Sequence, residues 1–193
     1  MTEAIETLEH NGCTIRILPD CDPIDPRNDE GNLGTMCLFH NRHGVPNETD
    51  LRSSNYASWY AVEQAIRRQY NVVALLPVYG YDHSVFCMSS RIERGWFHYN
   101  FDGGRLGFIF ATRERVKGLM GWTRITKERR AWLEGQLQNE LETYTQYTNG
   151  WVYGYEVEGP DGEDLDSCWG FYGKEYAIEE AKAACPTVAE TVN

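Results

Sequence analysis

The sequence lacks the signatures of the common enzyme classes. It contains no phosphate-binding loop of the P-loop type, no G-x-S-x-G nucleophile motif and no H-E-x-x-H zinc motif. It also contains no apolar run long enough to cross a bilayer. We therefore favour a binding protein over an enzyme, and we expect no association with a membrane.

Closely spaced cysteine pairs are absent as well. The six cysteines are spread along the chain, so neither a zinc knuckle nor a redox C-x-x-C motif is present. Near the beginning of the chain, Glu3, Glu6 and Glu9 interrupt any apolar segment of the kind found in secretory signals. We expect a cytoplasmic protein whose cysteines are free thiols and which binds no cofactor.

Charge is abundant but unevenly placed along the 193 residues, which carry a net charge of −11. Residues 1–60 carry −6, residues 61–130 carry +6 and residues 131–193 carry −11. A chain with this charge pattern fits a protein that is steered toward a charged macromolecule better than one that encloses a small neutral substrate.

The apolar patterning predicts hairpins and helices without regular βαβ alternation. One hairpin is expected around Asn11-Gly12 and a second around Pro160-Asp161-Gly162, because both are strong turn sequences. Helical periodicity predicts three main helices, and the remaining apolar runs predict strands. The predicted segments are Ile5–Glu9, Cys13–Leu18, Thr35–Phe39, Val72–Tyr79, Ser84–Met88, Leu106–Ala111, Trp151–Val157 and Asp164–Phe171 for strands, and Ser53–Tyr70, Lys127–Tyr147 and Glu175–Ala184 for helices.

This order of elements is typical of an α+β protein with a mainly antiparallel sheet and helices packed against it. The run Val72–Tyr79 is the most apolar and is expected to end near Pro77. Thr112 is expected to cap a further short helix. We expect one compact domain over residues 1–186, followed by a disordered tail at 187–193.

Several motifs resemble those of a family of small proteins encoded by bacteriophages and other mobile elements. They are Asn32-Leu33-Gly34-Thr35-Met36, Tyr81-Asp82-His83-Ser84, Glu142-Thr143-Tyr144-Thr145-Gln146-Tyr147 and Asp166-Ser167-Cys168-Trp169-Gly170-Phe171-Tyr172-Gly173. The resemblance extends from about Ile17 to Ala183. It implies no chemistry and transfers no catalytic residue. What it implies is a setting in the cytoplasm of a bacterial host, where accessory proteins of this size often act on host proteins, including defence systems.

The acidic last third of the chain supplies the leading candidate site. Six carboxylates gather on its predicted hairpin: Glu156, Glu158, Asp161, Glu163, Asp164 and Asp166. If they share a surface, they could occupy the phosphate-binding groove of another protein and compete with nucleic acid. The expected partner is a host protein, such as a nuclease or a nucleic-acid-binding defence complex of the kind that anti-CRISPR or anti-restriction proteins block. The alternative is an acidic surface that only keeps the protein soluble.

Four other patterns compete with this interpretation. Asp82, His83 and Ser84, with His40 and His43 nearby in the predicted fold, contain the residue types of a small hydrolase, although consecutive residues point in different directions. Asp20, Asp22, Asp25 and Asp29 offer oxygen ligands for a cation, in a spacing that does not match an EF-hand. Gly103-Gly104-Arg105 could bind an anion through backbone N–H groups. The basic middle, interleaved with aromatic residues, could hold single-stranded nucleic acid, which the overall negative charge disfavours.

Overall fold

The computed structural model describes residues 3–40, 44–96 and 99–186. Its backbone divides into two compact units, which differs from the single domain expected over 1–186. Unit 1 comprises residues 1–26 and 146–193, and unit 2 comprises residues 27–145. The division arises because the two ends of the chain pair with each other while the middle builds a core of its own. The tail expected at 187–193 lies outside the described residues.

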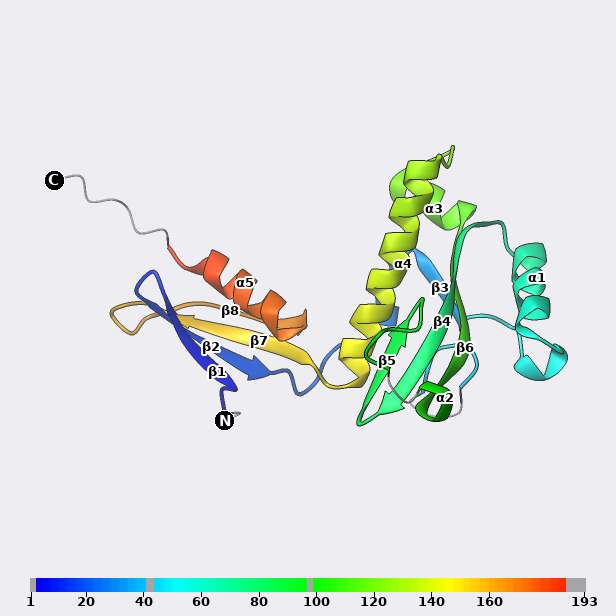
Figure 1. The fold of residues 1–193 in the computed structure, drawn as a ribbon. Helices are drawn as coiled ribbons and strands as arrows, with labels where there is room; N and C mark the ends of the chain where they lie inside the picture. Colours follow the sequence, from blue (N-terminus) through cyan, green and yellow to red (C-terminus); the bar gives the residue numbers. More distant parts are fainter. Residues whose placement is uncertain (1–2, 41–43, 97–98, 187–193) are drawn as a thin grey trace. The chain divides into compact units, whose positions relative to one another are not determined.

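Unit 1 is an antiparallel sheet with the strand order β1-β2-β7-β8. Its elements are β1 (Glu6–His10), β2 (Cys13–Pro19), β7 (Val152–Glu158), β8 (Asp164–Tyr172) and helix α5 (Lys174–Ala184). The turn between β1 and β2 places both Asn11 and Gly12 at positive φ, as a type I′ turn requires. Helix α5 packs against the sheet (Figure 1).

The sheet of unit 1 has two chemically different faces because side chains alternate along a strand. Ile15 and Ile17 of β2 and Tyr155 and Val157 of β7 are buried against Ala177, Ala181 and Cys185 at α5. On the opposite face of the same strands, Arg16, Glu156 and Glu158 are polar and only half-buried, whereas Leu18 and Gly154 are buried. The face opposite α5 is therefore the polar face of unit 1.

Unit 2 holds the second antiparallel sheet, with the order β3-β6-β4-β5. Its strands are β3 (Gly34–Leu38), β4 (Val72–His83), β5 (Val85–Ser89) and β6 (Gly103–Thr112). Its helices are α1 (Trp59–Gln69), α2 (Tyr99–Asp102), α3 (Arg113–Met120) and most of α4 (Lys127–Thr148), with short 3₁₀ turns at Pro26–Asn28 and Ser53–Asn55. Helices α1 and α4 lie on opposite sides of this sheet (Figure 1).

The core of unit 2 follows from the alternation along β6. Phe108 and Phe110 pack with Val62 and Ile66 of α1. Ile109 points to the other side, where the buried apolar stripe of α4 lies. The members of that stripe are Leu133, Leu137, Leu141 and Tyr144, and the polar Thr145 is buried beside them.

The α+β class and the antiparallel pairing predicted from the sequence are confirmed, although the described residues form two sheets. Helix α1 begins later than predicted, with Ser58 as its N-cap, and Thr112 caps α3 as expected. Strand β4 continues past Pro77 to His83. Pro77 is tolerated because β5 pairs with β4 only from Tyr79 onward, so the missing N–H disrupts no bond on that side. In the described part of the chain, no helix combines the length and apolar composition needed to cross a membrane.

Candidate functional site

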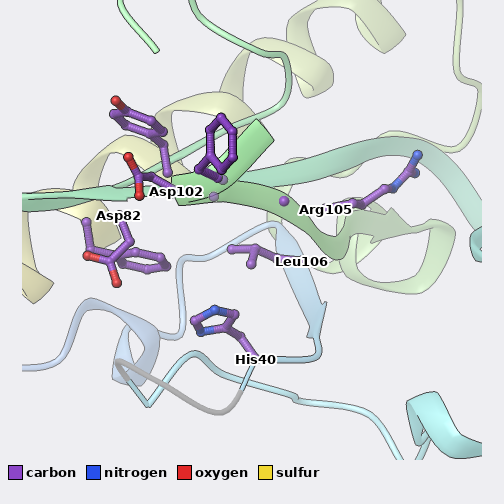
Figure 2. Close-up of a pocket in the computed structure, with 11 residues that line it drawn as sticks. His40, Asp82, Asp102, Arg105 and Leu106 are labelled. Atoms are coloured by element: carbon purple, nitrogen blue, oxygen red, sulfur yellow. The ribbon is translucent and has the colours of Figure 1, made fainter. Parts of the chain in front are cut away.

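A cavity of about 230 Å³ lies where β4 and β6 of unit 2 meet helix α2 (Figure 2). Two residues expected together from the sequence, His40 and Asp82, both line it. The His40 ring stacks on Phe86, with ring centroids 5.9 Å apart, and Phe86 is the cross-strand partner of Asp82. The lining residues are His40, Gly80, Tyr81, Asp82, Phe86, Phe101, Asp102, Gly103, Gly104, Arg105 and Leu106.

His83 does not join Asp82 in this cavity lining. Neighbouring residues on a strand point to opposite faces, and the His83 ring instead stacks on Tyr81. Its Nδ1 lies 3.0 Å from Oδ2 of Asp102, and the His83 side chain is 56% exposed. Ser84 occupies the turn between β4 and β5 with φ of +71°. The consecutive Asp82-His83-Ser84 therefore does not form a catalytic triad, and His43 lies outside the described residues.

Asp102 is a residue that the sequence analysis missed. It is 19 positions from His83, in a segment without a periodic pattern, and the two meet only because α2 folds back beside the end of β4. No local sequence motif predicts such a pairing. A carboxylate on one imidazole nitrogen fixes the orientation of the ring, which is the arrangement that a general base requires.

Arg105 is among the residues that line the cavity, and its side chain extends away from His40 and Asp82 (Figure 2). The guanidinium carbon lies 4.5 Å from the ring centroid of Phe108, and 5.5 and 5.7 Å from those of Tyr79 and Trp59. Its Nε is buried without a hydrogen-bond partner in the described structure. The three rings thus hold this side chain on the α1 side of the sheet. Gly103 and Gly104 begin strand β6 and do not form the anion-binding loop considered from the sequence.

The acidic loop considered as a cation site is held by its own backbone contacts. Oδ1 of Asp20 accepts a hydrogen bond from the N–H of Asp22 at 3.0 Å, and Oδ1 of Asp29 accepts one from Gly31 at 2.7 Å. Asp20, Asp22 and Asp25 belong to unit 1, whereas Asp29 belongs to unit 2. Among the residues described, no three His, Cys, Asp or Glu side chains gather closely enough to hold a metal ion.

The six acidic residues of the β7–β8 hairpin are distributed over different parts of it. Asp166 pairs with Val157 and accepts a 2.7 Å hydrogen bond from the hydroxyl of Tyr155, on the side of the sheet that faces α5. Burial of Tyr155 and this bond to Asp166 raise the pKa of the phenol. In the turn, Glu163 accepts a hydrogen bond from the N–H of Asp161 at 3.1 Å. These three residues therefore do not share the face of the remaining carboxylates.

Glu156, Glu158 and Asp164 lie together on the polar face of unit 1. Arg16 is the cross-strand partner of Glu156, and its Nη2 binds Oε2 of Glu158 at 2.6 Å. That hydrogen bond to Glu158, together with the nearby carboxylates of Glu156 and Asp164, raises the pKa of Arg16. One arginine thus faces three carboxylates, and Glu156 has no ion-pair partner among the described residues.

Charge in this protein is divided by unit more sharply than by sequence segment. Unit 1 contains sixteen acidic and three basic residues and carries −13, whereas unit 2 contains thirteen acidic and fifteen basic residues and carries +2. The basic middle of the sequence is thus offset by acids within its own unit. Part of it supports loops, since Arg115 donates to the carbonyl oxygens of Asn32 and Glu30 at 2.7 Å each.

Comparison of this chain with protein-family models, with curated proteins and with solved structures finds no match.

Proposed function

We propose that this protein acts by binding a basic surface of another protein through the acidic hairpin of unit 1. The observation that supports this proposal best is the polar face opposite α5, where Arg16 is the one cation that faces Glu156, Glu158 and Asp164 among the described residues. This face belongs to a unit of net charge −13, so its field extends the attraction of the local carboxylates.

A face of this kind suits partners that ordinarily hold phosphate groups. A groove lined by lysine and arginine attracts carboxylates as it attracts nucleic acid, and occupancy by one excludes the other. We therefore infer an accessory protein of a bacteriophage or mobile element, the setting that the sequence motifs suggest. Its target is a nucleic-acid-processing defence protein in the cytoplasm of the bacterial host, which it inhibits or modulates.

The test is affinity capture from nuclease-treated host lysate at low and moderate salt. The doubly charge-reversed variant Glu156→Lys, Asp164→Lys should lose the partner that the unchanged protein captures. The variant Glu175→Lys, Glu179→Lys makes the same change in net charge at exposed positions of α5 and should retain it. Because salt screens surface charges, the captured partner should also elute as salt rises. Equal capture by both variants would refute binding through the polar face.

A second candidate function is hydrolase-like catalysis in unit 2. The 3.0 Å contact between His83 and Asp102 favours it, because that contact orients an exposed imidazole beside a cavity that also contains His40 and Asp82. Screening with ester and phosphoester substrates tests this function. Turnover that is lost in His83→Ala and reduced in Asp102→Asn would support it, and turnover unchanged by both substitutions would exclude this pair.

A further inference from the structure

Strand β8 is at the edge of the unit 1 sheet, and within the described part of the chain its one strand partner is β7. Its residues from Asp164 to Gly170 are all exposed. The N–H of Ser167 is satisfied by Oδ1 of the adjacent Asp166 at 2.9 Å. The outer edge of such a strand presents backbone N–H and C=O groups that have no strand partner. A further extended chain can therefore pair with this edge through backbone hydrogen bonds.

Trp169 forms an aromatic platform beside this edge. A Cβ atom added to Gly154 of β7 would lie 2.1 Å from Cε3 and 2.4 Å from Cδ2 of the Trp169 indole, so the ring covers Gly154, where only glycine fits. The side of the ring away from Gly154 is open to solvent, since Trp169 remains 47% exposed. Tryptophan is the aromatic side chain that binds cations best, and a guanidinium can stack on it in the plane-to-plane manner that an ammonium cannot.

Carboxylates flank the platform on the same face. Glu156 lies two residues beyond Gly154 along β7, and every second residue of a strand lies on the same face of the sheet. Ser167, the cross-strand partner of Glu156, lies two residues before Trp169 on β8. An arginine stacked on Trp169 would thus have Glu156 on the same face of the sheet, while the existing Arg16 is bonded to Glu158.

We propose that β8 receives an extended, arginine-bearing segment of a protein partner, with one guanidinium stacked on Trp169 and paired with Glu156. The proposal rests on the proposed function and specifies how the basic partner is recognised. Charge complementarity selects this occupant, because a second copy would bring another unit of −13 to the same edge and nucleic acid would bring phosphates to carboxylates. The partner's backbone would replace Asp166 at the N–H of Ser167.

The probe is the fluorescein-labelled peptide Arg-Val-Arg-Val-Arg-Val-Arg, which places every arginine on one face when extended. Fluorescence anisotropy should show saturable binding to the full chain, weaker binding of the Lys-Val peptide, and weaker binding of a block peptide, Arg-Arg-Arg-Arg-Val-Val-Val. Trp169→Ala should weaken binding about tenfold. Trp169→Phe should retain most of the affinity and serves as the control for folding, and Trp151→Ala changes another exposed tryptophan of unit 1 without effect.

Cysteine footprinting locates the bound peptide. Cys168 on β8 and Cys21 outside the sheet are both exposed, so bound peptide should slow alkylation of Cys168 by iodoacetamide and leave Cys21 unchanged. A second outcome is that Glu156→Lys, Asp164→Lys abolishes peptide binding, while Trp169→Ala binds the peptide as tightly as the unchanged protein and bound peptide does not slow alkylation of Cys168. In that case the proposed function stands and strand addition at β8 is overturned. If no peptide binds and affinity capture also fails, both fail together. Dimerisation through β8 would appear as concentration-dependent association in sedimentation, together with concentration-dependent protection of Cys168 from alkylation. That result would overturn the proposal that the strand comes from a different protein.

Discussion

Arg27 joins segments of unit 2 that are far apart in the sequence. Its side chain is 9% exposed, and its nitrogens bind Glu48 Oε1 and Glu140 Oε2 at 2.7 Å each and the carbonyl oxygen of Gly34 at 2.6 Å. Glu140 in turn accepts hydrogen bonds from the backbone N–H groups of Leu33 and Gly34. Burial lowers the pKa of Arg27, but the hydrogen bonds to both carboxylates outweigh it, so the net shift is upward. This network fixes the entry to β3.

Arg27→Met should therefore be strongly destabilising, because it leaves two carboxylates without their cation. Removing one member of a buried ion pair costs about 3–5 kcal/mol, and the partial exposure of Glu48 places this substitution near 3 kcal/mol. Urea denaturation measures the loss. Arg67→Met removes the exposed Arg67–Glu63 pair on α1 and should cost less than about 1 kcal/mol. If Arg27→Met lowers the free energy of unfolding no more than Arg67→Met does, the network adds no more stability than an exposed ion pair.

Cys185 gives a pH dependence at the residue scale. Its burial in the core of unit 1, and then its hydrogen bond to Cys13, raise the pKa of the Cys185 thiol to about 11. Because the folded-state pKa is raised, the stabilisation is complete below the unfolded-state pKa of about 8.5 and is lost as the pH rises toward 11.

The free energy of unfolding should thus fall between about pH 8.5 and 11, and Cys185→Ala should make that fall smaller. Alkylation provides a second measurement in the folded protein. Cys21 and Cys168 should react first and Cys185 last across this range, because the first two are exposed and the last is buried and protonated. Rapid alkylation of Cys185 at pH 8 would contradict the buried position of its thiol.

At the scale of elements, one glycine at the contact between β3 and α4 and one on the exposed face of α4 predict opposite effects. A Cβ on Gly34 of β3 would lie 2.7 Å from Ile109 Cδ1 and 2.8 Å from Leu137 Cδ2, so this strand and α4 approach each other only because residue 34 has no side chain. Gly135 of α4 is exposed, and a Cβ there would meet nothing within 4 Å.

Gly34→Ala should lower the free energy of unfolding by about 1–3 kcal/mol through overpacking. Gly135→Ala should raise it by about 0.5–1 kcal/mol, because alanine restricts the unfolded chain and favours the helix. Both variants are measured by urea denaturation followed by circular dichroism. An unchanged or raised free energy of unfolding in Gly34→Ala would show that α4 does not pack on β3 as described.

Elements were predictable where the signal was local. Asn11-Gly12 occupies a turn with positive φ at both positions and so located the first hairpin, and Thr112 caps α3 through a local hydrogen bond, as predicted. The continuation of β4 beyond Pro77 could not be predicted, because it depends on where β5 begins to pair with β4, which is at Tyr79. Local sequence indicates whether a strand forms, whereas its length here depends on its partners.

At the scale of the whole molecule, pairing between distant segments decided what the sequence could not. Strand β2 pairs with β7 from opposite ends of the chain, which creates unit 1 and collects its acidic residues. The candidate site was therefore only partly predictable. Glu156, Glu158 and Asp164 share a face because their strands pair in register, while Asp166, two residues from Asp164, accepts its bond from Tyr155 on the other side. Alternation alone would put Asp164 and Asp166 on one face, and the irregularity in β8 between them places them on opposite faces.

The concentration of charge in unit 1 predicts that salt stabilises the two units unequally. With sixteen acidic and three basic residues, unit 1 repels itself, whereas unit 2 is nearly neutral. Raising the ionic strength from 0.01 to 0.1 M shortens the screening length from about 30 to about 10 Å, so repulsion across unit 1 declines. Hydrogen exchange followed by mass spectrometry should show several-fold slower exchange of the β2 and β7 amides, with little change for β4 and β6. Unit 2 is the internal control, and an equal response of both sheets would indicate a general salt effect instead of relief of repulsion within unit 1.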